Sequence, residues 1–297
     1  MINYFKRTSK GDVAFDVIKI IFLGTIVFVT LFPFINIVAI SLNDARDAIR
    51  GGIFLWPRVF STESYREVFR NTEFIFSIRI TVARTILGTI LALFVQSSVG
   101  YALSRREFVF RKSISLFLIF TMYFSVGLIP VFMLINALGL TNNFLVFILP
   151  GAMNMFNVIL IRSYIDSLPE SLVEAARIDG ANDLKIYFSI ILPLAKPILM
   201  TVGLFTAIGQ WNSWFDAHLY ITQQNLQPMQ AVLVQILNTY QPGGALSNQQ
   251  QLRPGQTLTP ESIRMAATVV STVPIILVYP FIQKHFIKGM LIGAVKD

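Results

Sequence analysis

The sequence contains no cysteine, so disulfide bonds, thiolate metal sites and cysteine nucleophiles are all excluded. Its two histidines, His218 and His285, lie far apart in the chain, so a histidine-based metal cluster is not expected. Charged residues are also scarce, at 13% of 297 residues, against about 25% in typical soluble domains. Hydrophobic residues make up 54% and are grouped in long runs. This composition predicts a membrane protein.

Six apolar segments reach the length of about 20 residues that a helix needs to cross the hydrocarbon core. Each is expected to be a helix, because backbone polar groups in lipid must be paired within their own segment. The sequence therefore predicts an all-α membrane protein whose whole length, 1–297, forms a single transmembrane domain. The six transmembrane helices are expected at about 18–41, 80–103, 114–136, 144–165, 194–219 and 263–283. The first is too long for a signal-peptide core and is expected to be retained.

The distribution of lysine and arginine predicts the orientation of these spans. Cations precede the first span, separate the second from the third and recur in the C-terminal tail, which places both termini in the cytoplasm. The 220–262 stretch has only Arg253 as a cation and is expected outside, with a short surface helix around 232–237. Residues 42–73 hold five arginines matched by five acidic residues, and are expected outside as a folded, charge-balanced cap.

A polar loop between the fourth and fifth spans, at 167–193, has the signals of a short helix. Ser167 can cap its start, Pro169 suits the first turn, and Glu170 complements the positive end of the helix dipole. Gly180 is the expected stop, because a residue with positive φ after a helix favours glycine. Pro193 is expected to break the chain just before the fifth span.

The same loop resembles the signature of permease subunits in ATP-binding-cassette (ABC) importers. That signature is Glu-Ala-Ala, three residues, Gly, nine residues, and Ile-x-Leu-Pro, and the chain has it as Glu174 to Ala176, Gly180, Ile190 and Leu192-Pro193. At ordinary residue usage, seven fixed positions would match by chance on the order of 10⁻⁶ of the time. Looser motifs at 102–105, 209–215, 280–288 and 289–296 are similar to those of maltose-type carbohydrate permeases, the MalG and LplC-like group.

The resemblance implies a type I ABC importer permease fold in the bacterial cytoplasmic (inner) membrane, as a multi-pass protein. It implies that the loop docks into an ATPase subunit through Glu170, Glu174, Ala175, Ala176, Asp179 and Gly180. The implied partners are an ATPase dimer, a second permease subunit that is related but not identical, and an extracytoplasmic solute-binding protein. The implied substrate is a sugar, of oligosaccharide size. Membrane lipid surrounds the spans, and nucleic acid is not an expected partner, because the cations form no continuous stripe.

The chain has no G-x-x-x-x-G-K-[ST] phosphate loop, so it is expected to be no enzyme and to bind no cofactor itself. ATP and Mg²⁺ would be used by the partner ATPase. A secondary carrier is the alternative transporter class, but it would need ion-coupling carboxylates within spans, and only Asp216 lies near the end of one. Within importers, a peptide or another non-sugar solute remains an alternative cargo.

Sugars are bound by aromatic faces and by amide or hydroxyl groups, so polar and aromatic residues within spans are candidates for the substrate path. They are Arg79, Arg84, Asn154, Asn157, Gln210, Trp211, Asn212 and Trp214. The two asparagines could instead connect helices, and the tryptophans could form an interfacial belt. Arg84 could lie among lipid headgroups or, if its helix begins earlier than 80–103 suggests, face the path and attract an acidic sugar such as a uronate.

Overall fold

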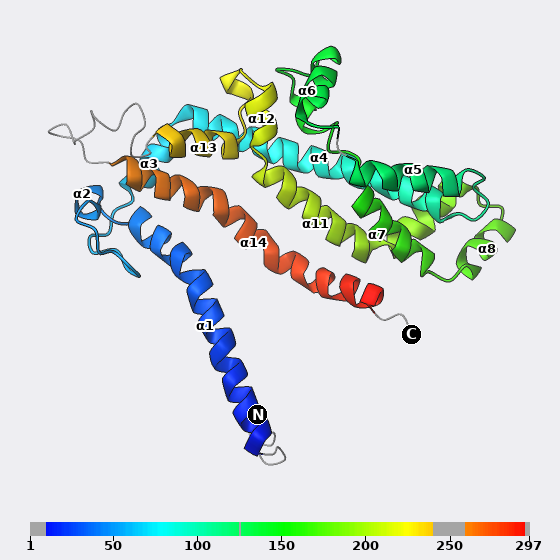
Figure 1. Cartoon of the computed structure of the whole chain (residues 1–297), viewed down its shortest axis with the longest axis horizontal. Helices are drawn as coiled ribbons and strands as arrows, with labels where there is room; N and C mark the ends of the chain where they lie inside the picture. The colour runs from blue at the N-terminus through cyan, green and yellow to red at the C-terminus, as the bar shows by residue number, and fades with distance from the viewer. Residues whose placement is uncertain (1–9, 125, 240–258, 295–297) are drawn as a thin grey trace. The chain divides into compact units, whose positions relative to one another are not determined.

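The computed structural model describes residues 10–124, 126–239 and 259–294, which are helical apart from loops and one isolated β-bridge (Figure 1). The chain divides into two compact units, 1–71 with 236–270, and 72–235 with 271–297, which are described separately. The helices before residue 72 are α1 (Lys10–Ser41), α2 (Ala45–Ala48) and α3 (Glu63–Arg70). They are followed by α4 (Thr72–Ser104), α5 (Arg111–Tyr123), α6 (Leu128–Ala137), η1 (Phe144–Phe147), α7 (Met155–Asp166), α8 (Ser171–Ile178), α9 (Asp183–Ile186), η2 (Tyr187–Ile191), α10 (Leu192–Leu194), α11 (Lys196–Asn212), α12 (Phe215–Tyr220), η3 (Gln224–Leu226), α13 (Met229–Thr239) and α14 (Pro260–Ala294).

Three helices in the described part of the chain are long and apolar enough to cross a membrane. They are α1, α4 and the 261–278 segment of α14. Two bent pairs, α5 with α6 and 183–194 with α11, raise this number to five if each pair forms one span. The chain is thus a helical protein with several apolar, membrane-length segments. The charges predicted to orient the chain at 1–9 and 295–297 lie outside the described residues.

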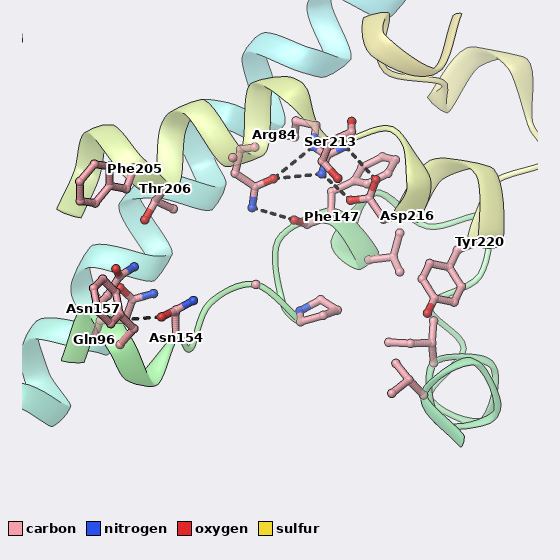
Figure 2. A pocket seen from close by; sticks show the side chains of 18 residues that line it. Arg84, Gln96, Phe147, Asn154, Asn157, Phe205, Thr206, Ser213, Asp216 and Tyr220 are labelled. Atoms are coloured by element: carbon pink, nitrogen blue, oxygen red, sulfur yellow. Dashed lines mark hydrogen bonds and ion pairs between the residues drawn. The ribbon is translucent and has the colours of Figure 1, made fainter. Parts of the chain in front are cut away.

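Three of the predicted helices are interrupted, so the prediction of continuous helices there is wrong. The 114–136 segment breaks between α5 and α6, and α11 ends before Ser213, whose ψ of 129° is extended. The 144–165 segment holds η1, a turn and then α7. There the side-chain oxygen of Asn154 accepts a hydrogen bond from the backbone N–H of Asn157, which caps α7 at its start (Figure 2). Apolar composition predicts burial in lipid, but helix caps decide where each helix begins.

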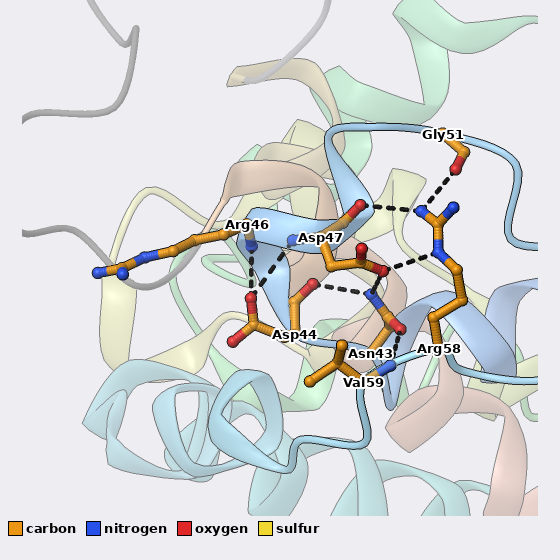
Figure 3. Close-up of polar contacts among 7 residues, drawn as sticks. All are labelled: Asn43, Asp44, Arg46, Asp47, Gly51, Arg58 and Val59. Atoms are coloured by element: carbon orange, nitrogen blue, oxygen red, sulfur yellow. Dashed lines mark hydrogen bonds and ion pairs between the residues drawn. The ribbon is translucent and has the colours of Figure 1, made fainter.

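The segment after α1 folds into the compact, charge-balanced cap that the sequence predicts (Figure 3). Asp44 caps α2 with its side chain, and Asn43 and Phe60 form the isolated antiparallel bridge. Asp47 accepts hydrogen bonds from Asn43 at 3.0 Å and from Arg58 Nε at 2.9 Å. The Asn43 hydrogen bond, with help from Arg58, lowers the pKa of Asp47 below its usual value. These contacts connect residues up to 17 positions apart, as in the Asn43–Phe60 bridge, and fix the loop conformation.

In the second unit, α4 packs against α7 and α11 (Figure 1). Gly100 on α4 permits the close approach to α7, because a Cβ atom there would lie 3.1 Å from Ile161. A buried apolar cluster joins α4, α7, α8, η2 and α11, and includes Tyr101, Ile161, Val173, Tyr187 and Val202. The loop between α7 and α11 is therefore anchored in the same core as the long helices.

The helix predicted around 232–237 is confirmed as α13, but it is more than a surface helix, because Ala231 and Leu233 are buried. Its first residue, Met229, donates its backbone N–H to the Thr81 hydroxyl of α4 at 2.8 Å, which holds the start of α13 against that helix. Residues 240–258 of the predicted external stretch lie outside the described residues.

Candidate functional site

A cavity of about 520 Å³ opens between α4, α6, η1, α7, α11 and α12 in the second unit (Figure 2). Its size falls in the range of about 300–1,000 Å³ that is typical of ligand pockets. Four of the predicted substrate-path residues line it, namely Arg84, Asn154, Asn157 and Gln210. These residues come from helices α4, α7 with its capping residue, and α11, which are distant in the sequence, and the fold brings them to one cavity. Their role in a substrate path stays a prediction.

The guanidinium of Arg84 is the centre of a buried polar network (Figure 2). Its Nε and Nη2 donate to the side-chain oxygen of Gln210 at 3.2 and 3.1 Å, and its Nη1 donates to the Ser213 carbonyl at 3.2 Å. Nη1 and Nη2 also donate to the two carboxylate oxygens of Asp216. The guanidinium carbon lies 4.3 Å from the centre of the Phe147 ring. These five hydrogen bonds match the five N–H donors of an arginine.

The local sequence explains this geometry. Because the helix ends before Ser213, the carbonyl of Ser213 points out of helix α11 and is available to Arg84. Gln210 connects a third element, since its Nε2 donates to the Phe147 carbonyl of η1 at 3.1 Å. Gly88 on α4 leaves room for this amide, because a Cβ atom there would lie only 2.8 Å from Gln210 Nε2.

The lipid-headgroup interpretation of Arg84 is wrong. Helix α4 begins at Thr72, well before the predicted start near residue 80, so Arg84 lies within the helix. Its side chain is 1% exposed and faces the cavity network. Arg79, five residues earlier, is exposed and lies over the ring of Phe76 at 5.2 Å. The two arginines are therefore not brought together.

The other candidates are divided between capping, packing and surface positions. Trp211 donates its indole N–H to the Ser271 carbonyl at 3.0 Å and lines a separate apolar groove between α4, α11 and α14. Asn212 accepts a hydrogen bond from the Gln230 side chain at 3.4 Å. Trp214 contacts the Phe215 ring edge-on and the His218 ring at a tilt. These three residues do not line the Arg84 cavity.

Sequence reasoning missed several residues of the cavity, above all Asp216, Gln96 and Phe147. Asp216 is 132 residues from its partner Arg84, and no local pattern joins them. A polar residue such as Gln96 within an apolar span was the available signal, because intramembrane polar residues usually face a cavity or another helix.

The second candidate site is helix α8, which carries the Glu-Ala-Ala motif. Its end is a Schellman motif, in which Ala181 N–H donates to the Ala176 carbonyl at 2.9 Å and Gly180 N–H to the Arg177 carbonyl at 3.0 Å. Gly180 has φ of +76°, as the sequence predicts. The predicted start is wrong, because the Ser167 hydroxyl bonds back to the Tyr164 carbonyl of α7 and α8 begins only at Ser171.

Helix α8 has one buried face and one open face. Val173 and Ala176 are buried in the core that includes α4 and α7. The open face presents the other predicted docking residues, Glu170, Glu174, Ala175, Asp179 and Gly180, all of which are exposed. Within the part of the chain that the structure describes, Glu174 forms no ion pair. Its carboxylate therefore remains available to a partner.

An ion pair that the sequence analysis did not foresee connects α8 to the loop after α4. The guanidinium of Arg177 pairs with both carboxylate oxygens of Glu107 and, at 3.3 Å, with Asp183. The hydrogen bonds from Arg177 lower the pKa of Glu107 below its usual value. Between these elements lies a polar cavity of about 560 Å³, lined by Arg105, Arg111 and Glu174 among others.

Comparison with known proteins identifies the family. Residues 84–292 match the family described as "Binding-protein-dependent transport system inner membrane component". The chain belongs to this family. The matched range begins at the buried arginine and includes the whole of α8, so both candidate sites lie within it.

Relatives and solved structures agree with this assignment. The chain is 38% identical to the polygalacturonan/rhamnogalacturonan transport system permease protein YtcP of Bacillus subtilis, over 95% of this chain and 98% of that protein. It is also 38% identical to protein LplC of Bacillus subtilis, over 99% of each. Among solved structures it is similar to a chain of a bacterial ABC transporter involved in the import of the acidic polysaccharide alginate, with a TM-score of 0.85, 34% identity and coverage of 94% and 99%.

Proposed function

We propose that this chain is the membrane-spanning permease subunit of an ATP-driven bacterial importer for a carbohydrate. The observation that carries the proposal is the similarity over 95% of the chain to a permease whose name specifies polygalacturonan and rhamnogalacturonan transport. The intact Glu-Ala-Ala helix supports coupling to an ATPase, because its Glu174 is exposed and forms no ion pair with any residue that the structure describes. The chain itself would bind no nucleotide, and hydrolysis would take place in partner subunits.

The proposed topology has six spans with both termini in the cytoplasm. Its support is the charge distribution of the loops together with the three long apolar helices and two bent pairs. The sixth crossing would come from the broken 144–166 segment, whose irregular backbone lines the cavity and so avoids lipid. Reporter fusions at Asn142 and Gln249 should report an external location, and a fusion after Lys296 an internal one. An internal signal at Gln249 would overturn this topology.

The proposed complex contains a second, unlike permease subunit, an ATPase dimer and an extracytoplasmic binding protein. ATP-driven closure of the ATPases would move α8, and because α8 shares a core with α4, α7 and α11, that movement would reach the helices that line the cavity. A stable, transport-competent complex that lacks any second permease chain would contradict the unlike pairing.

The proposed cargo is an oligosaccharide of the acidic, uronate-containing class. The support is the names of YtcP and of the alginate importer, both of which refer to acidic polysaccharides. Arg84 is the one cation among the described residues that line the cavity, and its charge is already balanced by Asp216. The attraction for a uronate would therefore come mainly from the binding protein or from the second permease.

The proposal is tested by uptake into proteoliposomes that contain the whole complex, with the binding protein outside and trigalacturonate as the probe. We expect uptake that requires ATP and is unaffected by ionophores that dissipate ion gradients. Uptake without ATP, driven by an ion gradient, would indicate a secondary carrier instead. Uptake of a tripeptide in place of every sugar offered would refute the carbohydrate assignment.

A further inference from the structure

Two amide side chains at one end of the Arg84 cavity are buried without full hydrogen bonding. Gln96 on α4 is 0% exposed, and its Oε1 has no hydrogen-bond partner among the described residues. Its Nε2 donates to the Ala152 carbonyl at 3.1 Å. Because that carbonyl can only accept, this contact fixes the orientation of the amide and leaves Oε1 as the free acceptor.

Asn157 on α7 lines the same cavity and is 8% exposed. Its backbone N–H donates to the Asn154 side chain. Its side-chain amide has no hydrogen bond to another described residue and is not among the enclosed polar atoms, so it is open to the cavity. Buried polar groups in native proteins are nearly always hydrogen-bonded, so the unpartnered Oε1 of Gln96, next to a cavity that also holds the open amide of Asn157, points to a bound ligand or water.

The surroundings of these amides favour a carbohydrate ligand. Figure 2 shows Gln96, Asn154 and Asn157 grouped on one side of the view, with Phe205 and Thr206 near them, and Arg84 and Asp216 on the other side. Gln96 is 0% exposed in this structure, so a ligand reaches it only in a state of the transporter in which the cavity opens toward α4. In that state a sugar hydroxyl can donate to the free Oε1 of Gln96 and accept from the amide of Asn157. Phe205, which is 43% exposed, offers an aromatic face for the C–H side of a sugar ring.

An acidic sugar can be recognised through its carboxylate charge or through its hydroxyl groups, and the charge of the cavity favours the second. Arg84 and Asp216 are the charged residues among its described lining, and they neutralise each other, so this cavity has no net charge to attract a uronate. We propose that Gln96 and Asn157 form an uncharged subsite that binds sugar hydroxyls during translocation. The subsite rests on the proposed carbohydrate function and specifies how this subunit contacts its cargo.

Asn157→Leu is the main test, because it removes the amide without removing an intramolecular hydrogen bond. Replacing an unpartnered buried amide with an apolar side chain should leave the melting temperature unchanged or raise it. The loss of one or two substrate hydrogen bonds should nevertheless raise the trigalacturonate concentration for half-maximal uptake about tenfold. A purely structural role for Asn157 predicts the reverse, a lower melting temperature with unchanged uptake.

Gln96→Met tests the second amide at similar volume, and Thr89→Val is the matched control. The Thr89 hydroxyl is also buried without a partner on α4, but it lines the apolar groove on another side of the helix. We expect Gln96→Met to weaken uptake about tenfold, as for Asn157→Leu. We expect Thr89→Val to leave uptake unchanged.

The outcomes separate the subsite from the proposed function. If the wild-type complex takes up trigalacturonate and both amide variants match its concentration dependence, the subsite is refuted and the amides hold only water. If the wild-type complex takes up no carbohydrate with any ATP supply, the proposed function fails, and the subsite fails with it. Weaker uptake in both amide variants, with Thr89→Val unchanged, supports the subsite.

Discussion

Two arginine–carboxylate pairs in the second unit differ in burial, and the difference separates the roles of the two candidate sites. Arg84 and Asp216 have side chains that are 1% and 25% exposed, whereas the side chains of Arg177 and Glu107 are 38% and 64% exposed. Both arginines approach both oxygens of their carboxylate. A guanidinium deprived of water depends on its partner far more than one at the surface.

The buried Arg84–Asp216 pair thus stabilises the packing of α4 against α11 and α12. The exposed Arg177–Glu107 pair only positions α8 at the surface. Arg84 connects α4, α11 and the start of α12, so its loss would disturb the wall of the cavity. Arg177 connects α8 to the loop after α4 in a region open to solvent, where a partner protein could replace its contacts.

The largest effect is expected from Asp216→Asn, which leaves the charge of Arg84 buried and uncompensated. The free energy of unfolding should fall by an amount toward the lower end of about 3–5 kcal/mol, because Asp216 is partly exposed. Denaturant unfolding of the purified complex measures the change. Arg79→Gln, an exposed position on the same helix, is the control and should leave stability unchanged.

The double variant Arg84→Met with Asp216→Leu sharpens this prediction. Replacing both partners with apolar residues removes the uncompensated charge, so much of the lost stability should return. A double variant that is less stable than either single variant would show that the pair is not the source of the effect.

A smaller effect on stability, but a large one on coupling, is expected from Gly180→Leu. A side chain at φ of +76° costs about 1–2 kcal/mol of strain, and within the chain it meets no atom within 4 Å. Gly139→Leu is a matched control, with φ of +67° and equally open space at the end of α6. Both variants should lose similar stability, but only Gly180→Leu should abolish ATP-driven uptake. Equal uptake in the two variants would contradict docking at Gly180.

The smallest effect is expected from Glu107→Gln, which removes the exposed pair. Because Arg177 lowers the pKa of Glu107, the pair stabilises the folded state above the ordinary pKa, and this contribution disappears as the pH falls through the lowered value. Unfolding midpoints of the variant and the wild type should therefore differ slightly at pH 7 and converge in acid. They should also converge at high salt. A difference that persists in acid would mean that Glu107 acts through another contact.

The sequence predicts helix α8 better than the cavity, for physical reasons. The stop at Gly180 depends on one local backbone conformation, and the whole motif lies within the single segment 174–193, so both can be identified without the fold. The predicted start of α8 is wrong because the Ser167 hydroxyl can either donate to a carbonyl of α7 or accept from an N–H at the start of α8. Residue propensity alone does not decide between these two hydrogen bonds.

The cavity depends on contacts that no local pattern encodes. The sequence identifies Arg84 as a candidate for the substrate path, but its partner Asp216 lies beyond a helix break at Ser213 that apolar composition conceals. Asn154 was chosen as a polar residue within a span, and the fold makes it the cap that ends the irregular segment before α7. Polar residues in apolar segments therefore indicate which residues line the cavity. Their hydrogen-bond partners can be identified only from the tertiary structure.

The most direct test of the account is the amount of sugar moved per ATP hydrolysed by the Glu174→Ala variant of the complete complex. Glu174 is exposed and unpaired within the described chain, so the variant should keep the wild-type melting temperature. If Glu174 is the contact to the ATPase, the variant should lose most of its trigalacturonate uptake. Either ATP hydrolysis then continues without transport, or the ATPase dissociates from the complex. Uptake at the wild-type rate would contradict the assignment of α8 as the coupling element.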